Sequence, residues 1–128
     1  YTHNSTDKFV AYCWQNVEGM QRFGSFEGNG NSDGPQIYTG FRPALLILKR
    51  TSSSGFWNVF DGTRKTGNLT ANPYLVWNNN DSEASGVPID FLSNGFKVRS
   101  SGSGVNSSGN TMIYMAWGDV PFKYNNTF

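Results

Sequence analysis

Residues 44–50 read Ala-Leu-Leu-Ile-Leu-Lys-Arg and contain the longest aliphatic run of the 128-residue chain. Successive side chains of a strand point to opposite faces, so a strand formed by this run is apolar on both faces. Such a strand needs cover on both sides and lies in the interior of a sheet rather than at its edge. The run therefore predicts a central strand, and the segments around it should supply its neighbours.

Short aromatic and β-branched segments recur on both sides of this run, separated by polar turns. The expected strands are Phe9–Gln15, Met20–Glu27 with a bend or bulge near Gly24, Phe56–Asp61, Tyr74–Trp77, Ile89–Leu92, Phe96–Arg99 and Thr111–Trp117. No segment has a convincing helical pattern. This organisation predicts an all-β fold, an antiparallel two-sheet β-sandwich of jelly-roll or concanavalin-lectin-like type.

The clearest hairpin surrounds Asn94-Gly95, the residue pair preferred in tight turns that match the twist of the strands. After the turn, Phe96 and Val98 alternate with Lys97 and Arg99. The alternation predicts that the two charged side chains face solvent while the two apolar ones face the core.

The composition favours an extracellular or virion-surface protein. Charged residues make up 15% of the chain, well below the roughly 25% usual for globular domains, whereas aromatic residues reach 16%. With a net charge of +1 and no basic track, no nucleic-acid partner is expected. No apolar run is long enough to span a bilayer, so no membrane insertion is expected. Cys13, the single cysteine, has apolar neighbours and is predicted to be buried and inert.

The sequence offers little for catalysis, and neither a metal nor a cofactor is expected. His3, the single histidine, precedes the first expected strand and has no evident partner for nucleophilic catalysis. Asp61 and Asp90 could form the carboxylate pair of a glycosidase, but turn-capping and solubilising roles are the more common use of such residues. The loop at residues 28–34 carries asparagine and aspartate oxygens suited to calcium but lacks the EF-hand pattern, so a turn without metal is expected.

Two stretches of the chain resemble one another. Residues 9–17 read Phe-Val-Ala-Tyr-Cys-Trp-Gln-Asn-Val, and residues 112–120 read Met-Ile-Tyr-Met-Ala-Trp-Gly-Asp-Val, an offset of 112 − 9 = 103 positions. A period near one domain length indicates a module from a tandem array. We therefore expect residues 1–19 to form a strand segment that echoes the closing strand of a preceding repeat. Residues 20–128 are expected to form the β-sandwich module. Whether residues 9–15 pair within their own domain or with a neighbour stays open.

Aromatic and amide side chains gather in two neighbouring polar regions and form a candidate ligand or receptor surface. Its members are Trp57, Asn58, Tyr74, Trp77, Asn78, Asn79, Asn80 and Asp81. Aromatic faces stack on sugar rings while amides and carboxylates bond hydroxyl groups. The alternative is that the aromatic side chains fill the space between the two sheets.

Several blocks resemble a recurring domain of tailed-bacteriophage structural proteins, found mainly in aquatic phages. They are residues 9–14, 17–19, 23–26, 28–30, 33–35, 38–44, 49–51, 90–97, 105–109 and 114–117, and Pro121-Phe122. The resemblance implies a virion or tail-fibre-like protein, built of consecutive copies beside lectin-like sandwich modules, with no catalytic residues. The segment between Asp61 and Gly86 departs from the pattern and is expected to hold any specificity.

The resulting hypothesis is a non-enzymatic virion structural module, most simply a tail-fibre or appendage domain that attaches the particle to a host surface. Its expected partners are other copies of itself, as in a trimer, other virion proteins and host-surface glycans, and its expected location is the virion surface. One alternative is a decoration or coat module of a capsid, tail tube or filament. A second is a carbohydrate-binding module or a glycan-active enzyme.

Overall fold

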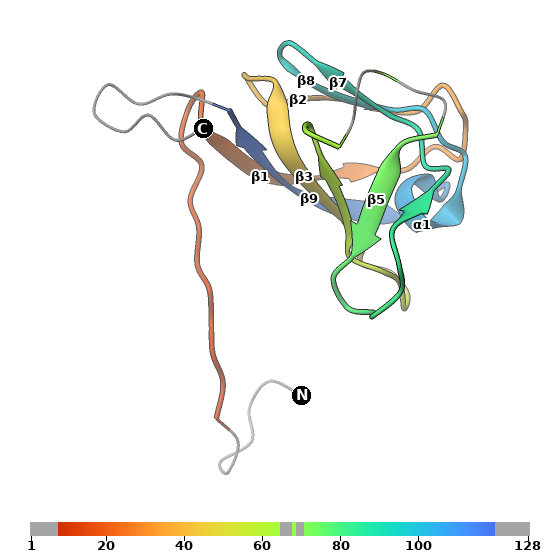
Figure 1. Cartoon of the computed structure of the whole chain (residues 1–128), viewed down its shortest axis with the longest axis horizontal. Coiled ribbons are helices and arrows are strands. Elements are labelled where there is room, and N and C mark those ends of the chain that lie inside the picture. Colours follow the sequence, from red (N-terminus) through yellow and green to blue (C-terminus); the bar gives the residue numbers. More distant parts are fainter. Residues whose placement is uncertain (1–7, 65–67, 69–70, 120–128) are drawn as a thin grey trace.

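The chain folds into two antiparallel sheets, seen in a computed structural model that describes residues 8–64, 68 and 71–119 (Figure 1). One sheet has six strands in the order β1-β9-β3-β4-β5-β6, and the other has three in the order β2-β8-β7. The strands are β1 (Gln21–Glu27), β2 (Gln36–Tyr38), β3 (Pro43–Arg50), β4 (Asn58–Asp61), β5 (Pro73–Val76), β6 (Ala84–Ser85), β7 (Ile89–Leu92), β8 (Gly95–Val98) and β9 (Thr111–Gly118). The prediction of an all-β, antiparallel two-sheet sandwich is confirmed.

Strand β3 occupies the interior of the six-stranded sheet, as its aliphatic sequence predicts. It pairs with β9 on one side and with β4 on the other. Leu46 and Leu48 are fully buried in the core between the sheets, and Ile47, which points to the opposite face, is only 1% exposed. Both faces of β3 are therefore covered.

The core lies between the two sheets and is built largely from aromatic side chains. The ring of Phe96 packs edge-on against Phe26 and Tyr114, with centroids 6.1 and 5.5 Å apart, while Phe60 packs on Tyr74. The buried members are Ile37, Phe41, Leu46, Leu48, Phe60, Ile89, Phe91, Phe96, Val98, Val105, Tyr114 and Ala116. Fully burying one such large apolar side chain contributes roughly 1.5–3 kcal/mol, so this cluster is the main source of stability.

The bend or bulge expected near Gly24 is absent. Strand β1 pairs with β9 in unbroken register from Gln21↔Trp117 to Glu27↔Thr111. A Cβ atom at Gly24 would lie 2.8 Å from the hydroxyl oxygen of Tyr114. The glycine leaves room for the tyrosine ring that crosses β1, and a side chain at this position would have to displace that ring.

The β7–β8 hairpin forms as predicted, with Phe96 and Val98 fully buried and Arg99 exposed. Its two-residue turn, however, consists of Ser93 and Asn94, and Gly95 already pairs within the strand. In the described part of the chain no residue other than glycine has a positive φ. Glycine is needed at position 95 because β2 packs closely against it: a Cβ there would lie 2.0 Å from the carbonyl oxygen of Ile37 on β2.

Three short elements were not expected from the sequence. Strands β2 and β6 have three and two residues, and the Gly/Ser-rich loop before β9 contains a one-turn helix, α1 (Ser103–Asn106). Elements this short carry too little periodicity to be recognised in a sequence.

The N-terminal segment, residues 8–16, is extended but forms no strand with the described residues, so the prediction of a strand at Phe9–Gln15 is wrong. We call this segment the arm. It runs away from the sandwich as an isolated ribbon (Figure 1). Cys13 is exposed on it, contrary to the prediction that this thiol is buried. Residues 1–7, including His3, lie outside the described residues, and the division of the chain at residues 19 and 20 stays a prediction.

The chain enters and leaves the sandwich at the same end. Residue Gln21, at the start of β1, pairs with Trp117 near the end of β9. The amide of Gly118 also donates a hydrogen bond to the carbonyl oxygen of Met20, at 2.7 Å. The first and last strands of the module therefore stabilise one another directly.

Candidate functional site

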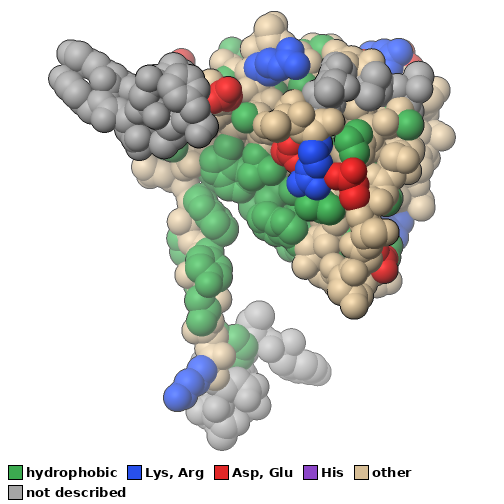
Figure 2. Space-filling model, viewed as in Figure 1, with side chains coloured by type: hydrophobic (Ala, Val, Ile, Leu, Met, Phe, Trp, Pro, Cys, Tyr) green, Lys and Arg blue, Asp and Glu red, His purple; other side chains and the backbone are tan. Residues whose placement is uncertain are grey.

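The outer face of the six-stranded sheet, opposite the core, is apolar. One row of directly paired residues crosses five strands in the order Phe23, Met115, Ile47, Val59 and Leu75. Antiparallel sheets that cover a core on one side usually present polar side chains on the other. Figure 2 shows hydrophobic side chains gathered on the body beside the arm. We call this row, with Trp117 next to it, the outer apolar face.

The base of the arm rests on this face through Trp14. Its ring stacks on Phe23 with centroids 6.1 Å apart and meets Trp117 edge-on at 6.5 Å. Tyr12 stacks in turn on Trp14, with ring centroids 6.1 Å apart. Aromatic pairs in these geometries contribute about 0.5–1.5 kcal/mol beyond their buried area, which fixes the base of the arm near β1 and β9.

An open groove of about 400 Å³ lies between the arm and the sheet. Its lining residues are Tyr12, Trp14, Trp57, Trp77, Asn78 and Met115. Backbone pairing holds two of the tryptophans together, because the amide of Trp77 donates to the carbonyl oxygen of Trp57 at 3.1 Å. The Trp57 amide donates to Oδ1 of Asn78 at 3.0 Å. The groove is thus an aromatic trough with one amide at its rim.

The structure brings together three of the eight residues of the predicted ligand surface: Trp57, Trp77 and Asn78. Asn58 is 5% exposed, on the core side of β4, and donates to the carbonyl oxygen of Phe56 at 3.4 Å. Tyr74 packs against Phe60, with ring centroids 5.7 Å apart, so it belongs to the core.

The other three predicted residues, Asn79, Asn80 and Asp81, are exposed on the loop after β5 and do not line the groove. Sequence reasoning missed Tyr12, Trp14 and Met115, which do line it. The likeness between residues 9–17 and 112–120 was the available signal, since it pairs Tyr12 with Met115 and Trp14 with Trp117.

The two carboxylates considered for catalysis lie on different sheets, and each has an arginine partner. Oδ2 of Asp61 on β4 forms an ion pair with Nε of Arg64 at 2.5 Å. Nη1 of the same arginine lies 2.9 Å from Oε2 of Glu83. Burial raises the pKa of Asp61, but hydrogen bonds from the backbone and side chain of Arg64 outweigh it and leave this pKa below its usual range. Asp90 on β7 lies 3.7 Å from Nε of Arg99.

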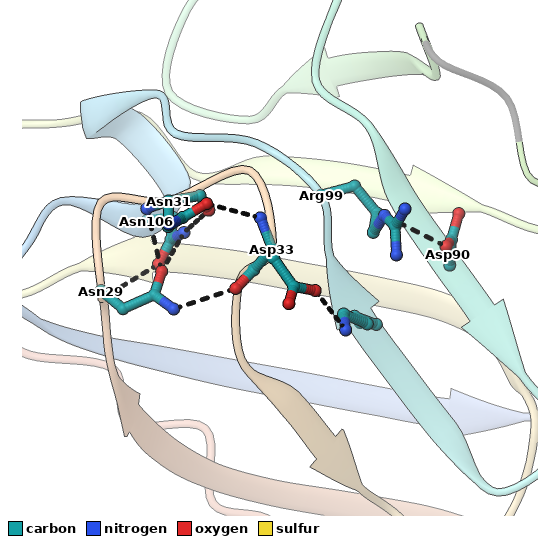
Figure 3. Close-up of polar contacts among 7 residues, drawn as sticks. Asn29, Asn31, Asp33, Asp90, Arg99 and Asn106 are labelled. Atoms are coloured by element: carbon teal, nitrogen blue, oxygen red, sulfur yellow. Dashed lines mark hydrogen bonds and ion pairs between the residues drawn. The ribbon is translucent and has the colours of Figure 1, made fainter.

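The loop considered for calcium uses its oxygens within the protein (Figure 3). Oδ1 of Asn29 accepts the amide of Asn31 at 3.0 Å, and Oδ1 of Asn31 accepts the amide of Asp33 at 2.9 Å. A hydrogen bond from Lys97, whose Nζ lies 2.6 Å from Oδ1 of Asp33, holds the pKa of that carboxyl below its usual range. Among the described residues there is no cluster of three histidine, cysteine or acidic side chains that could hold a metal ion.

The part of the chain that the structure describes contains no helix long and apolar enough to cross a membrane. No curated protein and no solved structure matches the chain. One family matches residues 1–121, a range that includes both the arm and the sandwich. The chain therefore belongs to the family described as Domain of unknown function (DUF7483).

Proposed function

We propose that this chain is a non-enzymatic structural module of a phage virion, located on the particle surface in an appendage of the tail-fibre type, where it assembles with other copies of itself and helps attach the particle to its host. The observation that carries the proposal is the outer apolar face together with the projecting arm. The resemblance to tailed-phage structural proteins supplies the virion context.

Apolar side chains remain exposed on this domain although its core is filled. The sandwich buries an aromatic core between its two sheets, and Ile47 and Val59 on the outer face are buried as well, so the apolar side chains left exposed on this side include those of the groove and the arm. Contiguous apolar surfaces on folded domains mark sites of association. The arm adds exposed Phe9, Val10, Tyr12 and Trp14, whose side chains are 54–77% exposed. A domain with this surface is suited to assembly more than to chemistry.

The test has two readouts. Sedimentation of the purified chain should show a concentration-dependent oligomer, and cryo-electron microscopy of the particle should locate it in an appendage. Many copies covering a shell, tube or filament would instead support the coat or decoration alternative. A strictly monomeric chain that is absent from the particle would overturn the proposal.

A second candidate function is glycan binding at the rim of the groove. The observation favouring it is that Trp77, 59% exposed, is followed directly by the exposed amides of residues 78–80 and by Asp81. Titration with host-surface polysaccharides should quench tryptophan fluorescence, and Trp77→Ala should abolish the response. Tyr38→Ala removes an aromatic ring that is 66% exposed on the other sheet and serves as the matched control. Equal responses in both variants would exclude this site.

A further inference from the structure

We infer that the occupant of the groove is the arm of a second copy of this chain, exchanged reciprocally between the two copies. The inference rests on the proposed self-association and specifies its geometry. Three features carry it: the arm is apolar and pairs with no strand of the described residues, the groove is suited to an apolar peptide, and both belong to one domain.

Among the described residues, the outer part of the arm finds little cover apart from the stacking of Tyr12 on Trp14. Phe9, Val10 and Tyr12 are 56%, 77% and 76% exposed, and among the described residues no strand pairs with their backbone. In Figure 2 the hydrophobic side chains of this segment stand clear of the body. The base of the arm is held by the contacts of Trp14 with Phe23 and Trp117. Two hydrogen bonds at 2.8 Å add to them, from Nε2 of Gln21 to the carbonyl oxygen of Gln15 and from the Phe23 amide to Oδ1 of Asn16. Its exposed apolar side chains are therefore available to a second molecule.

The groove favours an apolar peptide over a sugar. Four of its six lining residues are aromatic, and Asn78 is the one amide among the described residues that line it. Oδ1 of Asn78 already accepts the Trp57 amide. Small polar ligands are oriented by several convergent polar groups, which this trough does not offer. The arm matches it, because no charged residue occurs between Phe9 and Asn16.

A second copy is favoured over an unrelated partner because arm and groove occur together. The family match over residues 1–121 covers both, so each copy of the domain brings one arm and one groove. The arm also resembles β9, because Tyr12 and Trp14 correspond to Met115 and Trp117, which β9 places on this face of the sheet. In a reciprocal exchange each arm lies in the groove of the other copy. The two copies are then related by a twofold axis and form a closed dimer, with no arm or groove left to add a third copy.

The arrangement can be tested with the single cysteine, because Cys13 lies on the arm between two groove residues and is exposed. We would mix the native chain with an isotope-labelled Cys13→Ala/Asn78→Cys chain and oxidise mildly. Exchange predicts a disulfide between Cys13 of one chain and position 78 of the other, identified by mass spectrometry. The control partner, Cys13→Ala/Ser93→Cys, carries its thiol on the β7–β8 turn and should not be linked.

Sedimentation of variants gives a second readout that does not depend on cross-linking. Val10→Asp places a charge on a side chain that is 77% exposed, so it leaves the sandwich intact and should weaken self-association at least tenfold. Tyr38→Ser, on the other sheet, should leave it unchanged. An oligomer that resists Val10→Asp and gives no link to position 78 would overturn the exchange while leaving the proposed assembly function standing. A chain that is monomeric at every concentration would overturn both, and glycan quenching of that monomer would assign the groove to a sugar.

Discussion

Replacing Asn106 by alanine should lower the unfolding free energy of the sandwich substantially. Asn106 is the last residue of α1 and is 0% exposed, and its side chain contacts the loop at residues 28–34 (Figure 3). Its Oδ1 accepts the amide of Asn29 at 2.9 Å. Its Nδ2 lies 2.8 Å from the carbonyl oxygens of Asn31 and Ser100 and 2.9 Å from Oδ1 of Asn29. Since Nδ2 carries two hydrogens, its three acceptors share them.

The expected loss follows from the groups that the substitution leaves behind. About three full hydrogen bonds disappear, each contributing about 0.5–1.5 kcal/mol net, and the orphaned amide and carbonyl groups keep their desolvation cost. The loss in unfolding free energy should therefore be about 2–4 kcal/mol. For a domain of this size, this corresponds to a fall in melting temperature of roughly 10 °C.

The assay is urea and thermal unfolding followed by tryptophan fluorescence, with hydrogen exchange of the Asn29 amide as a local probe. The matched control is Asn79→Ala, which removes an exposed amide. Its Nδ2 donates to Oδ2 of Asp81 at 2.5 Å, and its Oδ1 accepts the amide of Asn80 at 2.8 Å. This substitution should cost less than about 0.5 kcal/mol, as exposed substitutions usually do. If the two variants unfold at the same urea concentration, the loop is not held by Asn106 and the reasoning is refuted.

Two further predictions concern β2–β8 packing and acid stability. Gly95→Ala places a Cβ 2.0 Å from the Ile37 carbonyl oxygen and should cost about 2–3 kcal/mol in thermal unfolding, whereas Gly104→Ala, with open space around it, should cost nothing. Asp61 has a folded-state pKa below its ordinary 3.8, so the stability it contributes is present above pH 3.8 and is lost as the pH falls through the lower folded value. Asp61→Asn should therefore reduce the loss of unfolding free energy on acidification. The reduction should be less than about 1 kcal/mol, because the pair with Arg64 is partly exposed. A variant whose unfolding free energy falls with pH as steeply as that of the native chain would contradict this.

Local patterns were enough to predict the elements whose neighbours lie nearby in the sequence. The aliphatic run at residues 44–50 could only be a doubly covered strand, and the alternation after Asn94 separated core from solvent correctly. The roles of Gly24 and Gly95 could not be predicted, because each is set by an atom that belongs to a distant strand: the Tyr114 hydroxyl and the Ile37 carbonyl oxygen.

Which residues line the candidate site depends on the face of the sheet to which each side chain points, and the sequence did not predict this for every strand. Trp57 and Asn58 are adjacent, yet one lines the groove and the other faces the core; Tyr74 and Trp77, three positions apart, separate in the same way. A shift of one residue moves every side chain of a strand to the other face, and pattern alone did not fix that parity. The prediction for the arm was wrong for a different reason: its aromatic and β-branched run suits a strand, but composition does not specify a pairing partner, and the arm pairs with no strand of the described residues.

The pairing of Met20 with Gly118 has a mechanical consequence. A chain that enters and leaves a domain at one end can carry that domain as a pendant, because the sandwich then lies beside the path of the chain and not along it. Tension applied through both ends would peel β1 from β9 one hydrogen bond at a time, starting at the Met20–Gly118 contact, instead of shearing the whole ladder at once. A nine-residue extended arm adds up to about 30 Å of reach before that peeling begins. A module with this arrangement would yield gradually under load instead of failing in one step.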